Sequence, residues 1–135
     1  MDQVYTLEQT DQIATQLVQN YAAHPVWVFQ APMGAGKTTL IAAIGRAMGI
    51  QQGMSSPTFS IMNEYEVQGK LIYHMDWYRL ENAAEARQAG VEAAMEEADL
   101  SLVEWPEKAP NLVPEHAVVF IIELIDPDHR RIYTK

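Results

Sequence analysis

The segment Ala31–Thr38, APMGAGKT, has the side-chain types and spacing best suited to a chemical function. It fits the phosphate-binding pattern Gly-x-x-x-x-Gly-Lys-[Ser/Thr], with alanine in the first position. Gly34 and Gly36 allow backbone N–H groups to turn inward around an anionic group. Lys37 can reach the outer phosphates of a nucleoside triphosphate, and the Thr38 hydroxyl is a suitable Mg²⁺ ligand. The predicted nucleotide-binding residues are Met33, Gly34, Ala35, Gly36, Lys37, Thr38 and Thr39. The alternative is a glycine-rich turn that only joins a strand to a helix.

Two acidic residues at predicted strand ends are candidates for holding Mg²⁺ and orienting water. Glu104 follows the predicted strand 100–103, in the position of a Walker-B acid, and Asp76 follows the run 71–75. Open α/β sheets bind ligands at strand ends, so both are candidate catalytic residues. Thr38 and Glu104 are the candidate metal ligands. The simpler alternatives are a solvated carboxylate for Glu104 and a turn residue for Asp76.

Several other positions carry two interpretations each. Hydroxyl groups at 55–58 either form a turn around a proline or belong to a switch segment that senses γ-phosphate or Mg²⁺, with Thr58 as the candidate switch residue. His74, considered on its own, is most simply a structural histidine. Trp105 is interpreted as packing at the sheet edge, or as a surface for substrate or partner. The pair 130–131 is interpreted as a solvated hairpin arm, or as arginines that approach the nucleotide.

The sequence around these residues predicts the elements that position them. An apolar run, 26–29, precedes the segment 31–38, and a helix expected over 37–48 follows it and ends at Gly49. An N-terminal helix starts at the capping-box pattern Thr6–Gln9 and ends before Pro25. Further strands are predicted at residues 1–5, 59–65, 71–76, 100–103 and 117–125, and a short strand that ends at residue 133 follows a turn at 126–129. Further helices are predicted at 82–88 and 91–98.

The order of these elements predicts the fold class. A glycine-containing connection at 66–70 indicates an antiparallel hairpin, whereas the strand–helix units are typical of parallel strands. We expect an α/β fold with a mixed central β-sheet flanked by helices, in a single P-loop NTPase-type domain over residues 1–135.

Composition limits the class of protein. The chain has 135 residues, a net charge of −9 and no cysteine. The acidic charge disfavours a broad nucleic-acid surface, and the absence of cysteine excludes disulfide and thiolate metal sites. No apolar stretch has membrane-spanning length, and the first residues lack the basic-then-apolar pattern of a signal peptide. We expect a cytoplasmic protein without a membrane contact, which meets any RNA through another protein.

Four motifs, taken in order, closely resemble the TsaE family of small bacterial P-loop ATPases, which are needed to form threonylcarbamoyladenosine on tRNA. They are GAGKTTL at 34–40, SSPTFSIMNEY at 55–65, HMDWYRL at 74–80 and LVEWPEK at 102–108. The resemblance implies ATP and Mg²⁺ as cofactors. It also implies association with a TsaD–TsaB pair, with ATP hydrolysis resetting that complex between turnovers, and at most an indirect contact with tRNA.

The resemblance assigns roles by matching position. Lys37 and Thr38 serve phosphate and Mg²⁺, Glu104 is a Mg²⁺-associated acid, Asp76 is a catalytic or metal-linked carboxylate, and Thr58 is a switch hydroxyl near the metal. The family usually has Gly-Asp-Leu-Gly where this chain has Ala-Pro-Met-Gly at 31–34. This change is at the loop entry, so we expect nucleotide binding to persist. The sequence stops at residue 135, which leaves the family's later contacts unassigned.

Two functions from other classes stay open at this point. A small-molecule kinase shares the phosphate loop but needs an arginine-bearing lid, and Arg79 and Arg87 are the only arginines between Arg46 and Arg130. A non-catalytic, nucleotide-gated scaffold would bind ATP and partners without useful turnover. A regulatory GTPase is disfavoured, since the sequence has no Asn-Lys-x-Asp guanine-reading segment.

Overall fold

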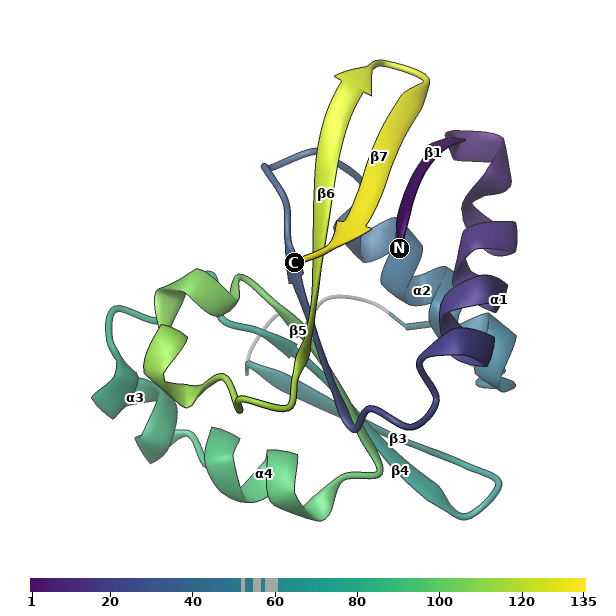
Figure 1. The fold of residues 1–135 in the computed structure, drawn as a ribbon. Helices are drawn as coiled ribbons and strands as arrows, with labels where there is room; N and C mark the ends of the chain where they lie inside the picture. The colour runs from purple at the N-terminus through teal and green to yellow at the C-terminus, as the bar shows by residue number, and fades with distance from the viewer. Residues whose placement is uncertain (52, 55–56, 58–60) are drawn as a thin grey trace.

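A computed structural model describes residues 1–51, 53–54, 57 and 61–135. Within these residues, seven strands form one mixed sheet in the order β1-β7-β6-β2-β5-β4-β3 (Figure 1). The strands are β1 Asp2–Thr6, β2 Val26–Gln30, β3 Met62–Val67, β4 Lys70–Asp76, β5 Leu100–Glu104, β6 Val118–Asp126 and β7 His129–Thr134. The helices are α1 Thr10–Asn20, α2 Lys37–Met48, α3 Ala83–Gln88 and α4 Val91–Glu97, with 3-10 turns at Leu7–Gln9, Pro106–Lys108 and Pro110–Leu112.

The centre of the sheet is parallel and both of its faces are covered. Strand β2 pairs in parallel with β5 and β6, and β4 pairs in parallel with β5. The edges are antiparallel, because β3 pairs with β4 and the pair β6–β7 continues to β1. In Figure 1, α1 and α2 lie together on one side of the sheet, and α3 and α4 lie on the other. The mixed sheet expected from the sequence is confirmed.

Strand β2 explains why the chain has two hydrophobic cores. Its side chains alternate, so that Trp27 and Phe29 belong to the core under α1 and α2, whereas Val26 and Val28 belong to the core under α3 and α4. All four are at most 1% exposed. A strand buried on both faces is therefore apolar along its whole length, as parallel central strands usually are.

Glycines mark both ends of α2. Gly36 and Gly49 adopt the left-handed conformation, with φ of 89° and 97°, immediately before and after the helix. A residue with a side chain is strained in that conformation, and glycine is not. The helix at 37–48 has the bounds that the sequence predicted. The N-terminal α-helix begins at Thr10 rather than at residue 7, because the capping-box segment forms a 3-10 turn in which the Gln9 side chain accepts a hydrogen bond from the Thr6 N–H at 2.9 Å.

The other predicted elements differ only in their bounds. The hairpin between β3 and β4 turns at Gln68 and Gly69, both with positive φ. The strand expected at 59–65 is described from Met62 onward, and residues 59–60 of that prediction lie outside the described residues. No helix in the described part of the chain is long and apolar enough to cross a membrane.

Candidate functional site

The segment 31–38, called the glycine loop below, joins the carboxyl end of β2 to the first turn of α2. Gly34 and Gly36 have φ of 81° and 89°, so a side chain at either position would be strained. A Cβ added at either glycine would meet no atom within 4 Å among the described residues. The space beside both glycines is therefore open, as in a cradle that accommodates an anionic group.

A hollow of about 440 Å³ lies over the glycine loop and the ends of β4 and β5; it is called the loop hollow below. It brings together both candidate acids and most of the predicted nucleotide-binding residues. Its lining is Met33, Gly34, Gly36, Lys37, Thr38, Thr39, Asp76, Tyr78, Glu104 and Trp105. Among the predicted binding residues, Ala35 is not in this lining, because its side chain is buried in the core under α2.

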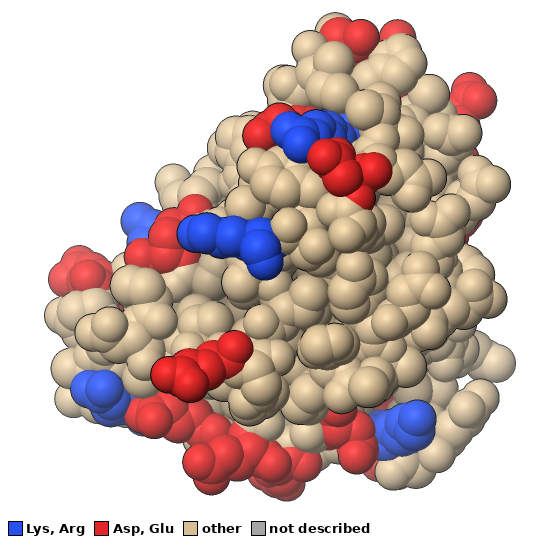
Figure 2. All heavy atoms as spheres, in the orientation of Figure 1, with Lys and Arg blue, Asp and Glu red and all other residues tan. Residues whose placement is uncertain are grey.

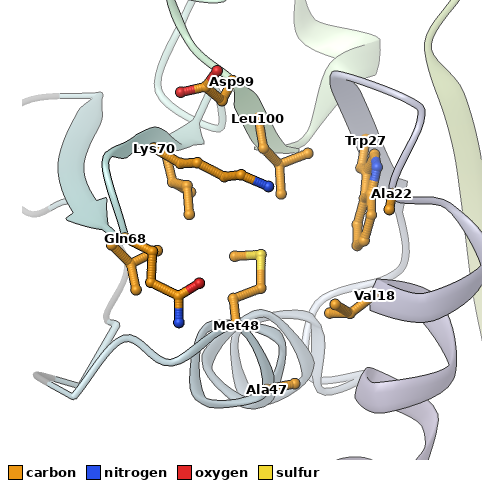
Figure 3. A pocket seen from close by; sticks show the side chains of 11 residues that line it. Val18, Ala22, Trp27, Ala47, Met48, Gln68, Lys70, Asp99 and Leu100 are labelled. Carbon is orange, nitrogen blue, oxygen red and sulfur yellow. The ribbon is translucent and has the colours of Figure 1, made fainter.

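A hollow of about 540 Å³ lies at the opposite end of the parallel strands (Figure 3). Its walls come from α1, the end of α2, the β3–β4 turn and the start of β5, and Trp27 and Met48 line it beside Lys70. None of the candidate chemical residues lines it. The loop hollow is therefore the candidate functional site.

Lys37 is held inside the site. Its Nζ donates a hydrogen bond to the Ala31 carbonyl oxygen at 3.1 Å and lies 3.4 Å from the centroid of the Trp105 ring. The ring face attracts the ammonium group. Burial lowers the pKa of Lys37, and the carboxylates of Glu104 and Asp76 partly oppose that effect. Lys37 thus rests on loop and indole atoms, within the same hollow as both acids.

Trp105, which contacts Lys37, has an unusual backbone conformation. It directly follows β5 and has φ of 60° and ψ of 50°, in the left-handed region that bulky residues rarely adopt. Strain of this kind is common at functional sites. Its ring is half-buried and lies 5.0 Å from the ring of Tyr78. Trp105 therefore packs at the end of the sheet and also forms a wall of the hollow.

Glu104 is buried and hydrogen-bonded, so the solvated alternative was wrong. Its side chain is 2% exposed. One oxygen, Oε1, accepts a hydrogen bond from the Thr38 hydroxyl at 3.1 Å, and the other, Oε2, lies 2.7 Å from Nε2 of His74. Burial alone would raise the pKa of Glu104, but the hydrogen bonds from His74 and Thr38 and the charge of Lys37 hold it below its ordinary value. Glu104 is therefore an ionised carboxylate in this site.

Asp76 lies beside Glu104 at the same end of the sheet. The two residues are paired in the register of β4 and β5. The Oδ1 atom of Asp76 accepts a hydrogen bond from the Tyr78 N–H at 2.9 Å, which is the turn contact that the simpler interpretation predicted. Asp76 also lines the loop hollow. The turn role is observed, and the catalytic role stays a prediction.

Arg130 supports the glycine loop, which the sequence interpretation of a solvated arm missed. It is 6% exposed, and its Nε donates to the Ala35 carbonyl oxygen at 2.9 Å. A terminal nitrogen donates to backbone carbonyls of the β6–β7 turn, including Asp126 at 2.9 Å. The neighbouring Arg131 is the solvated one, and it pairs with carboxylates at the surface. The candidate switch residue Thr58 lies outside the described residues, as do the serines at 55–56.

The donor atoms at the hollow are oxygens, which suit hard divalent cations such as Mg²⁺. Among the described residues, no group of three or more His, Asp or Glu side chains could hold a metal ion by itself. The loop hollow offers instead a hydroxyl from Thr38 and carboxylates from Glu104 and Asp76. Hard oxygen ligands, few in number and next to a phosphate cradle, are typical of Mg²⁺ bound together with a nucleotide.

Charges on the outside follow the acidic composition. On the face shown in Figure 2, the Lys and Arg side chains of the described residues lie singly or beside acidic ones, and they form no continuous basic surface. Proteins that grip a nucleic-acid backbone usually present such a surface.

Comparison with known proteins gives consistent matches. The model of a family described as "Threonylcarbamoyl adenosine biosynthesis protein TsaE" matches residues 4–132. A Synechocystis protein named tRNA threonylcarbamoyladenosine biosynthesis protein TsaE is 41% identical over 111 residues, covering 78% of this chain and 69% of that protein. The protein of the same name from Haemophilus influenzae is 36% identical over 94 residues, covering 70% of this chain and 60% of that protein.

A solved structure has the same fold. The crystal structure of Bacillus subtilis YdiB superposes with a TM-score of 0.74 at 25% sequence identity. The superposition covers 99% of this chain and 84% of that chain. The fold expected from the sequence is confirmed by this similarity.

Proposed function

The chain belongs to the TsaE family of tRNA threonylcarbamoyladenosine biosynthesis proteins, and from that premise we propose that it binds and hydrolyses ATP within that machinery. The observation that carries the proposal is the contact between Thr38 and Glu104. It joins the hydroxyl at the end of the glycine loop to a buried carboxylate at the end of β5, at 3.1 Å. In phosphate-loop enzymes, a hydroxyl and an acid in this relation share a Mg²⁺ ion.

ATP binding is proposed for the glycine loop. Backbone N–H groups around Gly34 and Gly36 would cradle the phosphates, and the start of α2 favours negative charge. Lys37 would leave the Trp105 ring and the Ala31 carbonyl to contact the outer phosphates. Met33, Ala35 and Thr39 complete the proposed binding segment. Pro32 removes one N–H at the loop entry only, so the cradle keeps its donors.

Metal binding and hydrolysis are proposed for the acids. Thr38 and Glu104 would hold Mg²⁺, which neutralises developing charge on the phosphates when it is bound. Asp76, one strand away, would accept a hydrogen bond from the attacking water and orient it. In this proposal Glu104 binds the metal ion and Asp76 orients the attacking water.

Partner control is the second part of the proposal. Lys37 is held by a carbonyl and an indole rather than poised at the mouth of the hollow. Releasing Lys37 from these two contacts costs free energy that a partner contact can offset. We therefore propose a low intrinsic turnover that a TsaD–TsaB pair raises, with hydrolysis resetting that complex in the cytoplasm. On the face that Figure 2 shows, the described residues form no continuous basic surface that could bind tRNA directly, and we propose that any contact with tRNA is indirect.

The same resting position of Lys37 favours one alternative, a nucleotide-gated scaffold that binds ATP without useful turnover. Phosphate release, measured with the chain alone, with a TsaD–TsaB pair, and with candidate phosphate acceptors, separates the functions. The proposal predicts slow release that rises with the pair and is unaffected by acceptors. ATP binding without release under any condition supports the scaffold, and phosphorylated acceptor supports a kinase.

A further inference from the structure

His74 is a buried histidine next to the proposed metal site, and none of the roles described above uses it. Its side chain is completely buried in β4. It lies opposite Leu102 in the register of β4 and β5, so Glu104, two residues further along β5, is its diagonal neighbour on the same face. Its Nε2 atom is 2.7 Å from Oε2 of Glu104.

The two oxygens of Glu104 have different tasks. Oε2 faces His74 in the core, whereas Oε1 faces Thr38 at the loop hollow. A carboxylate that is free to rotate could present either oxygen, or both, to either side. A fixed donor behind it removes that freedom, and hydrogen bonds to a ligating carboxylate commonly set its orientation.

We propose that His74 is a positioning residue, whose Nε2–H holds the Glu104 carboxylate so that Oε1 stays directed at Thr38 and the proposed metal position. This inference rests on the proposed function, because the orientation matters only if Glu104 serves Mg²⁺ and ATP hydrolysis. His74 touches neither nucleotide nor water in this scheme. It acts through Glu104 alone.

The chemistry of the contact defines where the hydrogen lies. A carboxylate can only accept hydrogen bonds, so a bond at 2.7 Å requires a hydrogen on Nε2. The other ring nitrogen, Nδ1, is buried and has no hydrogen-bond partner among the described residues. The Glu104 contact is therefore the interaction that favours the Nε2–H form of the ring over the form protonated on Nδ1.

Within the described part of the chain Nδ1 has no hydrogen-bond partner, which argues against a purely structural role. Burying a polar atom without a partner reduces stability, and an apolar side chain would fill the same space without that loss. The one hydrogen bond that His74 makes from its ring, within the described residues, is directed at the candidate metal ligand. Its place in the core is explained by that contact.

The test compares two substitutions at this position. In His74→Leu the side chain stays apolar and buried but cannot donate, whereas in His74→Gln an amide N–H can donate to Oε2 from a similar place. Loss of an interaction behind a metal ligand commonly costs roughly 10–100-fold in activity. We expect kcat for ATP hydrolysis, with the TsaD–TsaB pair present, to fall by that factor in His74→Leu with little change in KM. His74→Gln should recover most of the loss.

A double substitution tests whether the effect passes through Glu104. In a Glu104→Gln background, His74→Leu should cause little further loss of kcat, since the carboxylate it positions is already absent. Thermal unfolding of each variant shows whether it is folded. A His74→Leu variant with normal kcat, equal losses in the Leu and Gln variants, or a full additional loss in the Glu104→Gln background would each overturn the proposal.

A measurement that needs no turnover tests the geometry itself. Nitrogen-15 NMR of the imidazole rings, in the chain without nucleotide, reports which ring nitrogen carries a hydrogen. We expect a hydrogen on Nε2 of His74, and a shift of that signal in Glu104→Gln. A ring protonated on Nδ1 alone would contradict the inference. If the wild-type chain releases no phosphate with any partner, the proposed function fails, and the NMR result still decides whether His74 holds Glu104.

Discussion

Replacing Arg130 by methionine is predicted to destabilise the chain by about 2–4 kcal/mol and to weaken nucleotide binding. The substitution keeps an apolar stem but removes the guanidinium, which ties the Ala35 carbonyl to the turn between β6 and β7. A hydrogen bond from a charged donor contributes roughly 1.5–3 kcal/mol when its partner is buried. Arg130 makes one such bond, to the buried Ala35 carbonyl oxygen, and a second, partly buried one to the Asp126 carbonyl oxygen, which contributes less; both are 2.9 Å long and would be lost together.

The neighbouring residue provides a matched control. Arg131 is also in β7, but its guanidinium pairs with Asp2 and Glu123 at the surface. Exposed ion pairs contribute roughly 0–1 kcal/mol each, so Arg131→Met should have a much smaller effect. Urea unfolding gives the free energy of each variant, and titration with an ATP analogue gives its affinity. Equal stabilities for the two variants, or an Arg130→Met variant with wild-type affinity, would refute the supporting role of Arg130.

Three further predictions concern the loop hollow. Lys37→Ala should lose most nucleotide binding, because it removes the flexible cation aimed at the outer phosphates, and calorimetric titration checks this; unchanged affinity would remove the phosphate-loop assignment. Asp76→Asn should reduce hydrolysis by roughly a hundredfold at unchanged nucleotide affinity, in a phosphate-release assay, whereas a normal rate would leave Asp76 with its turn role only. Hydrogen bonds hold the pKa of Glu104 below its ordinary value in the folded chain. Ionised Glu104 therefore stabilises the fold at pH values above the ordinary pKa of glutamate, and this stabilisation is lost as the pH falls through the lowered pKa. Urea unfolding should therefore show wild type losing stability relative to Glu104→Gln as the pH falls below about 4.5, and parallel pH profiles would contradict this.

Local signals made much of the fold predictable. The ends of α2 follow from two glycines in the left-handed conformation, and β2 follows from an apolar run that is buried on both faces. The hairpin of β3 and β4 follows from its glycine turn. The start of α1 was placed too early, because a capping-box pattern also suits the 3-10 turn that precedes the helix.

The parts of the site that could not be predicted depend on long-range contacts. Arg130 donates a hydrogen bond to Ala35, which is 95 residues away in the sequence. Neither segment has a sequence pattern that indicates the strand register by which β7 lies near the glycine loop. The burial of Glu104 depends on β4 and β5 being parallel neighbours, which also places His74 behind it. Trp105, whose ring contacts Lys37, has a positive φ, and a tryptophan in the sequence does not indicate that conformation. Periodicity shows which face of a strand is buried, but not which strand lies beside it.

Phosphate release by Glu104→Gln, in the presence of a TsaD–TsaB pair, measures directly whether Thr38 and Glu104 form the site of ATP hydrolysis. This variant keeps nearly the same side-chain volume and removes the negative charge that faces Thr38. With binding of an ATP analogue measured on the same preparation, we expect phosphate release to fall by roughly a hundredfold or more while binding is retained. Release at the wild-type rate, with the variant folded and nucleotide-bound, would contradict the claim that Thr38 and Glu104 form the site of ATP hydrolysis.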